Sequence, residues 1–384
     1  MSGPKDHGGL VRHLFFLLAF VPLLSWNFFT MLTGYWMVKF RTPWPEPTAN
    51  ISWEEPVEVK MNPLQVDFTS YMVVTFMVPT VTVPLLNAVI GHRFSAAPRL
   101  LAALASLTIL VSFHLAMALT DTDAWQQEFL TLTLVTIFLL ASTISVFVSG
   151  FTGLAGCFPK DYMISLLRGQ SLCAVFTALA NIAILAAGSS PEADAFYCFG
   201  LTVLLQLVAL FAFVTMTRSE FYQHHAARPR PAAPEAAPLL GPPAGAPAGL
   251  AAVAWGVRVD LVTMVLLYAT TLACHPGLTV LVEATNLRTP AAGPWETTYF
   301  VPTACFLTFT VGNFLGRMVM PHLPTTSSTT NLILTLLRTA ALPLFLLCNL
   351  VPRQRVHTPV LLPSDLVYVL VMLLFSVSSG VLTR

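Results

Sequence analysis

The chain has 384 residues, of which 55% are hydrophobic and 10% charged, with a formal net charge of +1. Charges this sparse and this balanced exclude a nucleic-acid-binding protein, in which Lys and Arg gather into a basic footprint. The six cysteines show no CxxC or Cys/His spacing, so we predict no metal site, no redox site and no cofactor. We expect the cysteines to be small buried hydrophobic residues.

Long apolar stretches separated by short polar loops run through the whole chain. A helix needs roughly 20 apolar residues to cross the hydrocarbon core of a bilayer. In hydrocarbon each backbone polar group must be bonded within its own structure, which favours helices. The sequence therefore predicts an all-α, polytopic membrane protein with the lipid bilayer as its surroundings. The ten predicted spans are 11–37, 68–91, 98–120, 127–150, 162–188, 194–217, 259–283, 295–320, 331–351 and 364–384.

The first apolar stretch, from Val11, is too long for a cleavable signal peptide and lacks a small-residue cleavage site. The loop 38–67 follows it and contains Asn50-Ile51-Ser52, a candidate N-glycosylation acceptor. With the N-terminus in the cytosol, the inner loops carry most of the basic residues and the outer loops most of the acids, as the positive-inside rule requires. Asn50 then faces outward, where glycosylation takes place.

One long internal segment, 218–258, is rich in Ala, Pro and Gly and cannot bury enough apolar surface to order itself. We therefore predict a six-helix bundle over 1–217, a flexible cytosolic linker over 218–258, and a second bundle of four helices over 259–384. Two bundles joined in this way are typical of transporters. We expect the second bundle to be truncated, because the chain stops directly after the tenth apolar stretch.

Charged side chains at membrane depth are candidates for function by default. Arg317 lies in the eighth predicted span, and Asn313 lies one turn earlier on the same helix face. An amide and a guanidinium placed together can hold a polyhydroxylated solute through several directed hydrogen bonds. The alternative is that Arg317 extends to the cytosolic interface, because Pro321 ends the helix shortly afterwards.

Two further positions carry polar or aromatic groups inside predicted spans. Gln170 lies between Gly169 and Ser171, whose small side chains permit either solute access or a close helix–helix hydrogen bond. Trp26 precedes Asn27 in the first span and offers a flat apolar surface with one N–H donor, which suits a planar ring. Simple packing or anchoring is the alternative for this tryptophan.

Other intramembrane groups point to structure rather than chemistry. Arg338 is expected to extend to the interface or to pair with Asp260 or Glu283. His275-Pro276 marks a helix break, where a freed carbonyl can face a cavity. The chain contains no HExxH, no GxSxG and no phosphate-binding glycine loop, so we do not expect an enzyme.

Several motifs, in the same order along the chain, resemble those of the equilibrative nucleoside transporter family. The order makes the resemblance far more specific than any one motif. The matching segments are 24–29 (LSWNFF, against LPWNFF in the family), 153–159 with Gly169-Gln170, 294–296 leading into 306–309, 313–317 (NFLGR, against DWLGR), and 338–349 with Pro352-Arg353.

The resemblance implies an eleven-helix fold related to the major facilitator superfamily, with a nucleoside held between two bundles and carried by alternating access. No ATP-binding motif is present, so the solute gradient is expected to drive this facilitated diffusion. We expect residence in the plasma membrane, with a lysosomal or endosomal membrane as the alternative. By resemblance, Trp26, Met77 and Phe306 line the pocket, Gln170 binds the base, and Asn313 and Arg317 bind the ribose hydroxyls.

The chain departs from the family pattern at three places. Asn313 replaces an aspartate, which removes a strong acceptor for ribose hydroxyls and a countercharge for Arg317. The family's SNGYL becomes SSGVL at 378–382, and the eleventh helix is missing. These departures leave two alternatives open: a transporter of another small polar solute, such as a nucleobase or an organic cation, or a non-transporting truncated form that regulates a partner.

Overall fold

The computed structural model describes residues 4, 6–41, 62–226, 255–276, 278–287, 289–290, 292–340, 342–350 and 360–383. Asn50 and most of the predicted linker lie outside these residues, so the glycosylation site and the linker remain predictions. Within the described residues, the chain folds almost entirely into helices, with two isolated bridges, Val282 to Leu350 and Cys348 to Leu362.

The structure confirms the all-helical class and the ten predicted spans. The helices before the linker are α1 (Leu10–Met31), α2 (Thr33–Lys39), α3 (Pro63–Ile90), α4 (Ala96–Ala118), α5 (Gln126–Ala155), α6 (Lys160–Ala187), α7 (Pro191–Arg218) and α8 (Glu220–Ala226). Those after it are α10 (Arg258–Cys274), α11 (Thr308–Val319), α12 (Ser328–Thr339), α13 (Leu342–Leu347) and α14 (Asp365–Leu382). Within the described residues, ten helical segments are long and apolar enough to span a bilayer, and three of them, Arg258–Leu281, Trp295–His322 and Ser328–Leu347, join shorter helices. These segments define an integral multi-pass membrane protein.

The observed ends of the helices differ from the predicted ends where local chemistry starts or stops a helix. The first span ends at Met31 rather than at residue 37, because Leu32 leaves the helical conformation and the short helix α2 begins. Helix α3 starts at Pro63, five residues earlier than predicted. Asn62 caps it by accepting from Gln65 N, and the Gln65 side chain bonds back to Asn62 N. This reciprocal arrangement is a capping box.

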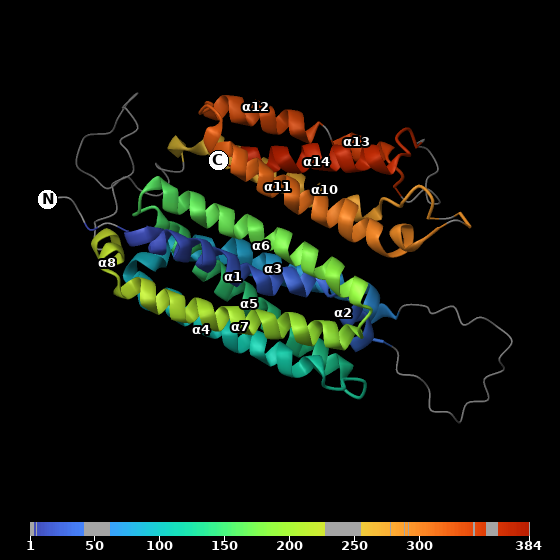
Figure 1. Ribbon diagram of the computed structural model, residues 1–384, viewed down its shortest axis with the longest axis horizontal. Helices are drawn as coiled ribbons and strands as arrows, with labels where there is room; N and C mark the ends of the chain where they lie inside the picture. Colours follow the sequence, from blue (N-terminus) through green and yellow to red (C-terminus); the bar gives the residue numbers. More distant parts are fainter. Residues whose placement is uncertain are drawn as a thin grey trace. The chain divides into compact units, whose positions relative to one another are not determined.

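The contacts divide the chain into two units. Unit 1 comprises residues Met1–Cys173 and Ala187–Arg228, and unit 2 comprises Ala174–Ala186 and Pro229–Arg384. In unit 1, α4 packs along α5 and α7, α3 packs along α5, and α1 packs against α7 and α5 (Figure 1). In unit 2, α11 packs along α14, and α10 packs along α12 (Figure 1).

Aromatic side chains fill the core of unit 1. Phe15 of α1 lies between three rings, with its centroid 4.8 Å from Phe151, 4.9 Å from Phe158 and 5.5 Å from Tyr162. All four side chains are buried. Aromatic pairs at these separations add specific stabilisation to the burial of apolar area, so this cluster joins α1, α5 and α6 at one end of the unit.

Buried glycines permit the closest helix contacts in each unit. A Cβ added at Gly169 of α6 would lie 2.3 Å from the carbonyl oxygen of Phe16 in α1. In unit 2, a Cβ at Gly316 of α11 would lie 2.3 Å from Val377 O of α14, and one at Gly380 would overlap Asn313 O. Small residues let membrane helices approach backbone to backbone, and both contacts occur beside residues that the sequence singles out.

We expect Gly316→Ala to destabilise the protein, because the new Cβ meets a backbone carbonyl and α11 must move away from α14. Overpacking of this kind typically costs about 1–3 kcal/mol. Thermal unfolding of the purified variant in detergent measures the loss. Gly200→Ala in α7 is the matched control, since its Cβ would lie an ordinary 3.8 Å from Leu115 Cδ1. If the two variants unfold at the same temperature, Gly316 is not needed for the close contact between α11 and α14.

Candidate functional site

Trp26 of α1 and Met77 of α3, two of the predicted site residues, both lie in unit 1. The Trp26 ring stacks on Phe76 of α3, with centroids 3.4 Å apart and planes inclined by 14°. Met77 follows Phe76 in the chain, and both Trp26 and Met77 are partly buried. The stack holds the indole plane against α3 and leaves part of its surface accessible. The sequence analysis did not name Phe76 as a candidate site residue, and the only feature of the sequence that points to it is its position next to Met77.

Gln170 lies on α6 directly after Gly169, at the close contact with α1. Its side chain is partly buried, and its amide makes no hydrogen bond to another described residue. The neighbouring α1 amide behaves differently, because Asn27 Nδ2 donates to Cys173 Sγ at 3.3 Å. Asn27 therefore joins α1 to α6, whereas Gln170 keeps its donors and acceptor available. The predicted alternative of a helix–helix hydrogen bond through Gln170 is not observed among the described residues.

Unit 2 carries the other three predicted site residues on one helical segment. Phe306 lies in the π-helical stretch Val301–Leu307, which continues into α11 with Asn313 and Arg317. Spacings of seven and four residues place the three side chains on one face. All three are partly buried. The Arg317 Nε atom is fully buried without a hydrogen-bond partner, and the Asn313 amide bonds no described residue.

Arg338 was expected to extend to the interface or to pair with Asp260 or Glu283, but it is buried, with 6% of the residue exposed. It forms no ion pair with Asp260 or Glu283 in the described part of the chain. Its Nε atom instead donates to Ser378 Oγ at 3.2 Å, and its guanidinium lies 3.8 Å from the centre of the Phe375 ring. A cation over an aromatic face is stabilised by the ring quadrupole, so Arg338 joins α12 to α14.

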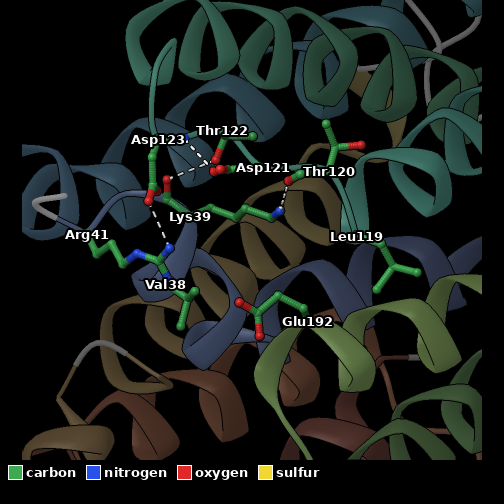
Figure 2. Close-up of a pocket in the computed structure, with 9 residues that line it drawn as sticks. All are labelled: Val38, Lys39, Arg41, Leu119, Thr120, Asp121, Thr122, Asp123 and Glu192. Carbon is green, nitrogen blue, oxygen red and sulfur yellow. Dashed lines mark hydrogen bonds and ion pairs between the residues drawn. The ribbon is translucent and has the colours of Figure 1, made fainter. Parts of the chain in front are cut away.

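A polar pocket, which sequence reasoning did not identify, lies in unit 1 where α2, the α4–α5 loop and the start of α7 meet (Figure 2). Its cavity measures about 180 Å³. Arg41 pairs with Asp123 at 2.8 Å, and the Lys39 ammonium donates to Thr120 O. The lining residues are Val38, Lys39, Arg41, Leu119, Thr120, Asp121, Thr122, Asp123 and Glu192.

Lys39 is the unusual member of this pocket, because only 5% of the residue is exposed. Burial lowers the pKa of its ammonium, and the nearby carboxylates of Glu192 and Asp121 offset part of that effect. Thr122 Oγ1 also donates to the Lys39 carbonyl at 3.3 Å. These bonds fasten the end of α2 to the α4–α5 loop.

The described residues hold no group of three or more His, Cys, Asp or Glu side chains that could bind a metal ion. Five of the six cysteines are buried. The membrane helices of unit 1 carry the Trp26–Phe76 stack and the Gln170 amide, and the segment of unit 2 that ends in α11 carries Phe306, Asn313 and Arg317. Such groups recognise a polar solute that has a flat apolar part.

Comparison with known proteins identifies the family. The model of the family described as "Nucleoside transporter" matches residues 134–236 and 249–384. The chain belongs to this family. It is 27% identical to equilibrative nucleoside transporter 1 of Rattus norvegicus, over 99% of this chain and 89% of that protein. It is 28% identical to equilibrative nucleoside transporter 3 of the same species, over 100% of this chain and 82% of that protein.

The lowered pKa of Lys39 predicts a pH-dependent contribution to stability. Near its ordinary pKa of 10.5, the unfolded chain binds more protons at this group than the folded chain does. The unfolding free energy of the parent protein should therefore rise, relative to that of Lys39→Met, as the pH increases toward 10.5.

Thermal unfolding of both proteins across neutral to alkaline pH measures this difference. Arg93→Met is the control, because arginine stays charged throughout the range and Arg93 is not among the charges that shift the pKa of Lys39. The difference in unfolding free energy between this control and the parent should not change with pH. If the unfolding free energies of the parent and Lys39→Met change with pH in the same way, the pKa of Lys39 is not lowered in the folded protein.

Proposed function

We propose that this protein transports nucleosides across a membrane by facilitated diffusion, through alternating access. The observation that carries the proposal is the set of unsatisfied polar groups, Gln170 in unit 1 and Asn313 with Arg317 in unit 2, on membrane-spanning helices of a chain in this family. Polar groups at membrane depth that bond no other part of the protein are functional candidates. The relatives named above are called equilibrative nucleoside transporters, which supports the same substrate class.

Unit 1 supplies the groups that we assign to the base. The Trp26–Phe76 stack and Met77 offer an apolar surface against which a planar heterocycle can lie. Gln170 has both a carbonyl acceptor and an NH₂ donor free, so it can bond a base edge that presents either kind of group. This combination favours a solute with an aromatic, hydrogen-bonding ring over a simple sugar.

Unit 2 supplies the groups that we assign to the ribose. The guanidinium of Arg317 presents donors in a fixed plane, and the Asn313 amide adds a donor and an acceptor one turn away. Two vicinal hydroxyls can bond both side chains together. Phe306, on the same face, lies on the side of Asn313 away from Arg317 and supplies apolar contact. Among the described residues no carboxylate pairs with Arg317, so the ribose meets a neutral amide and an unpaired cation.

The proposed cycle uses the bundle over 1–217 and the bundle over 259–384, connected by the linker over 218–258. A solute speeds exchange only when its affinity differs between states of the cycle. Solute bonds that form in one state and break in the other would provide such a difference. The solute gradient supplies the driving force, in the plasma membrane or in an intracellular membrane.

We expect proteoliposomes that contain the 384-residue chain to take up radiolabelled uridine in a saturable manner. Arg317→Ala should lower uptake at low uridine concentration by about ten- to hundredfold, because it removes a charged hydrogen bond worth roughly 1.5–3 kcal/mol. Arg41→Ala makes the same substitution at the polar pocket and should leave uptake near that of the parent. If Arg317→Ala takes up uridine as fast as the parent, Arg317 does not bind the solute. If neither the parent nor the variants take up uridine, a non-transporting role is favoured.

Asn313→Asp should strengthen uridine binding by about tenfold, because a carboxylate accepts hydroxyl hydrogen bonds more strongly than an amide and compensates the charge of Arg317. The apparent KM for uridine uptake measures the change. Asn313→Leu, which removes both polar groups, should raise KM instead. If Asn313→Asp and Asn313→Leu shift KM in the same direction, residue 313 does not bond the ribose.

A further inference from the structure

His275 lies at the end of α10, where the chain leaves the helix. Its backbone N–H still donates to Thr271 O at 2.7 Å, which closes the last turn. The imidazole stacks on Phe309, with centroids 3.9 Å apart and planes inclined by 15°. The edge of Phe306 approaches the same ring, with centroids 5.5 Å apart at 71°. The imidazole is thereby held against two aromatic side chains of the segment that carries Phe306, Asn313 and Arg317.

One nitrogen of this imidazole is fixed by neighbouring side chains. His275 Nδ1 lies 3.1 Å from Thr279 Oγ1 and 3.6 Å from Cys305 Sγ. Thr279 is held in turn, because Tyr368 donates its O–H to the Thr279 carbonyl at 2.9 Å and the Cys305 thiol donates to Thr279 Oγ1 at 3.3 Å. Partners on one imidazole nitrogen fix both the tautomer and the ring orientation.

The distances favour one tautomer. The Thr279 hydroxyl hydrogen can go to His275 Nδ1 at 3.1 Å or to the Pro276 carbonyl at 3.5 Å, and the shorter contact is the better hydrogen bond. With Nδ1 as the acceptor, the ring proton lies on Nε2.

The second nitrogen, Nε2, has no partner among the described residues, although the residue is only 9% exposed. It is also not among the fully buried polar atoms that lack a partner, in contrast to Nδ1 of His114 in unit 1. Nε2 therefore retains accessible surface while most of the ring is covered. A nearly buried side chain with one accessible, unsatisfied N–H is built to bond something that enters from outside the chain.

The position of His275 relative to Asn313 suggests what that ligand is. Phe306, which the imidazole contacts, lies seven residues before Asn313, or about 10 Å along a helix axis. A nucleoside with its ribose at Asn313 and Arg317 extends toward Phe306 through its base. We infer that His275 Nε2–H donates a hydrogen bond to an acceptor on the base of the transported nucleoside. This inference rests on the proposed function and adds a residue that determines specificity.

The experiment compares uridine with its non-polar isostere, the 2,4-difluorophenyl riboside, which keeps the shape of the base and lacks its carbonyl acceptors. Each compound competes against radiolabelled uridine uptake in proteoliposomes. His275→Phe, which preserves the aromatic packing, should reduce the preference for uridine by about three- to tenfold, as expected for the loss of one neutral hydrogen bond. His275→Gln, which retains an N–H donor, should recover part of the preference.

Three comparisons separate base recognition from a merely structural role. The preference for uridine over 3′-deoxyuridine should stay unchanged in His275→Phe, because the ribose contacts remain. His322→Phe, an exposed position in the same unit, should match the parent throughout. His275→Leu provides a second apolar variant if His275→Phe does not fold, and the same reduced preference is expected of it.

An unchanged preference in a folded apolar variant would overturn the inference, as would equal losses of affinity for uridine and its isostere. Absence of saturable uridine uptake by the parent chain would overturn the proposed function and this inference with it. Normal parent uptake with an unaltered preference would overturn the inference alone.

Discussion

The absence of water in the bilayer interior is the constraint on which the rest of this structure depends. Every polar group there must find a partner within the protein. Gln206 of α7, fully buried, donates to Ser25 of α1 at 2.9 Å, and the Thr108 hydroxyl donates to Leu104 O within its own helix. Some buried polar atoms of the described residues lack a partner, among them Gln206 Oε1, Arg99 Nε and Arg317 Nε. Of the groups without a partner, the Gln170 amide and Arg317 are two that also lie in motifs of the family. Their missing partners are best supplied by a solute.

Close backbone packing determines where these unsatisfied groups lie. Gly169 brings α6 against α1 one residue before Gln170, and Gly316 brings α11 against α14 one residue before Arg317. A side chain next to such a contact is positioned by backbone atoms rather than by flexible neighbours. Each unit thus repeats one arrangement, in which a glycine contact is followed by a polar group without a protein partner. Binding surfaces on rigid helices hold their groups more precisely than surfaces on loops.

The spans could be predicted because length and apolar character are local properties of the chain. The candidate site residues could be named because they lie within motifs that resemble those of the family. Contacts between distant segments could not be predicted. The stack of Trp26 on Phe76 joins α1 to α3, and the Lys39 pocket joins α2 to a loop 81 residues further on. Arg338 forms neither of the two expected arrangements among the described residues, because its guanidinium is buried and contacts the Phe375 ring and Ser378 Oγ on α14. His275 could be identified from sequence as a helix break, but its accessible nitrogen depends on the three-dimensional arrangement of Thr279, Phe306 and Phe309.

We propose that the Gln170 amide and the Arg317 guanidinium both contribute to nucleoside binding. Equilibrium binding of radiolabelled uridine to the purified protein tests it most directly, with Gln170→Ala in unit 1, Arg317→Ala in unit 2, and the double variant. Each single substitution should weaken binding, and the double variant should bind more weakly than either, while the parent binds one uridine per chain. Binding that only one of the two substitutions weakens, or two independent sites in the parent, would contradict it.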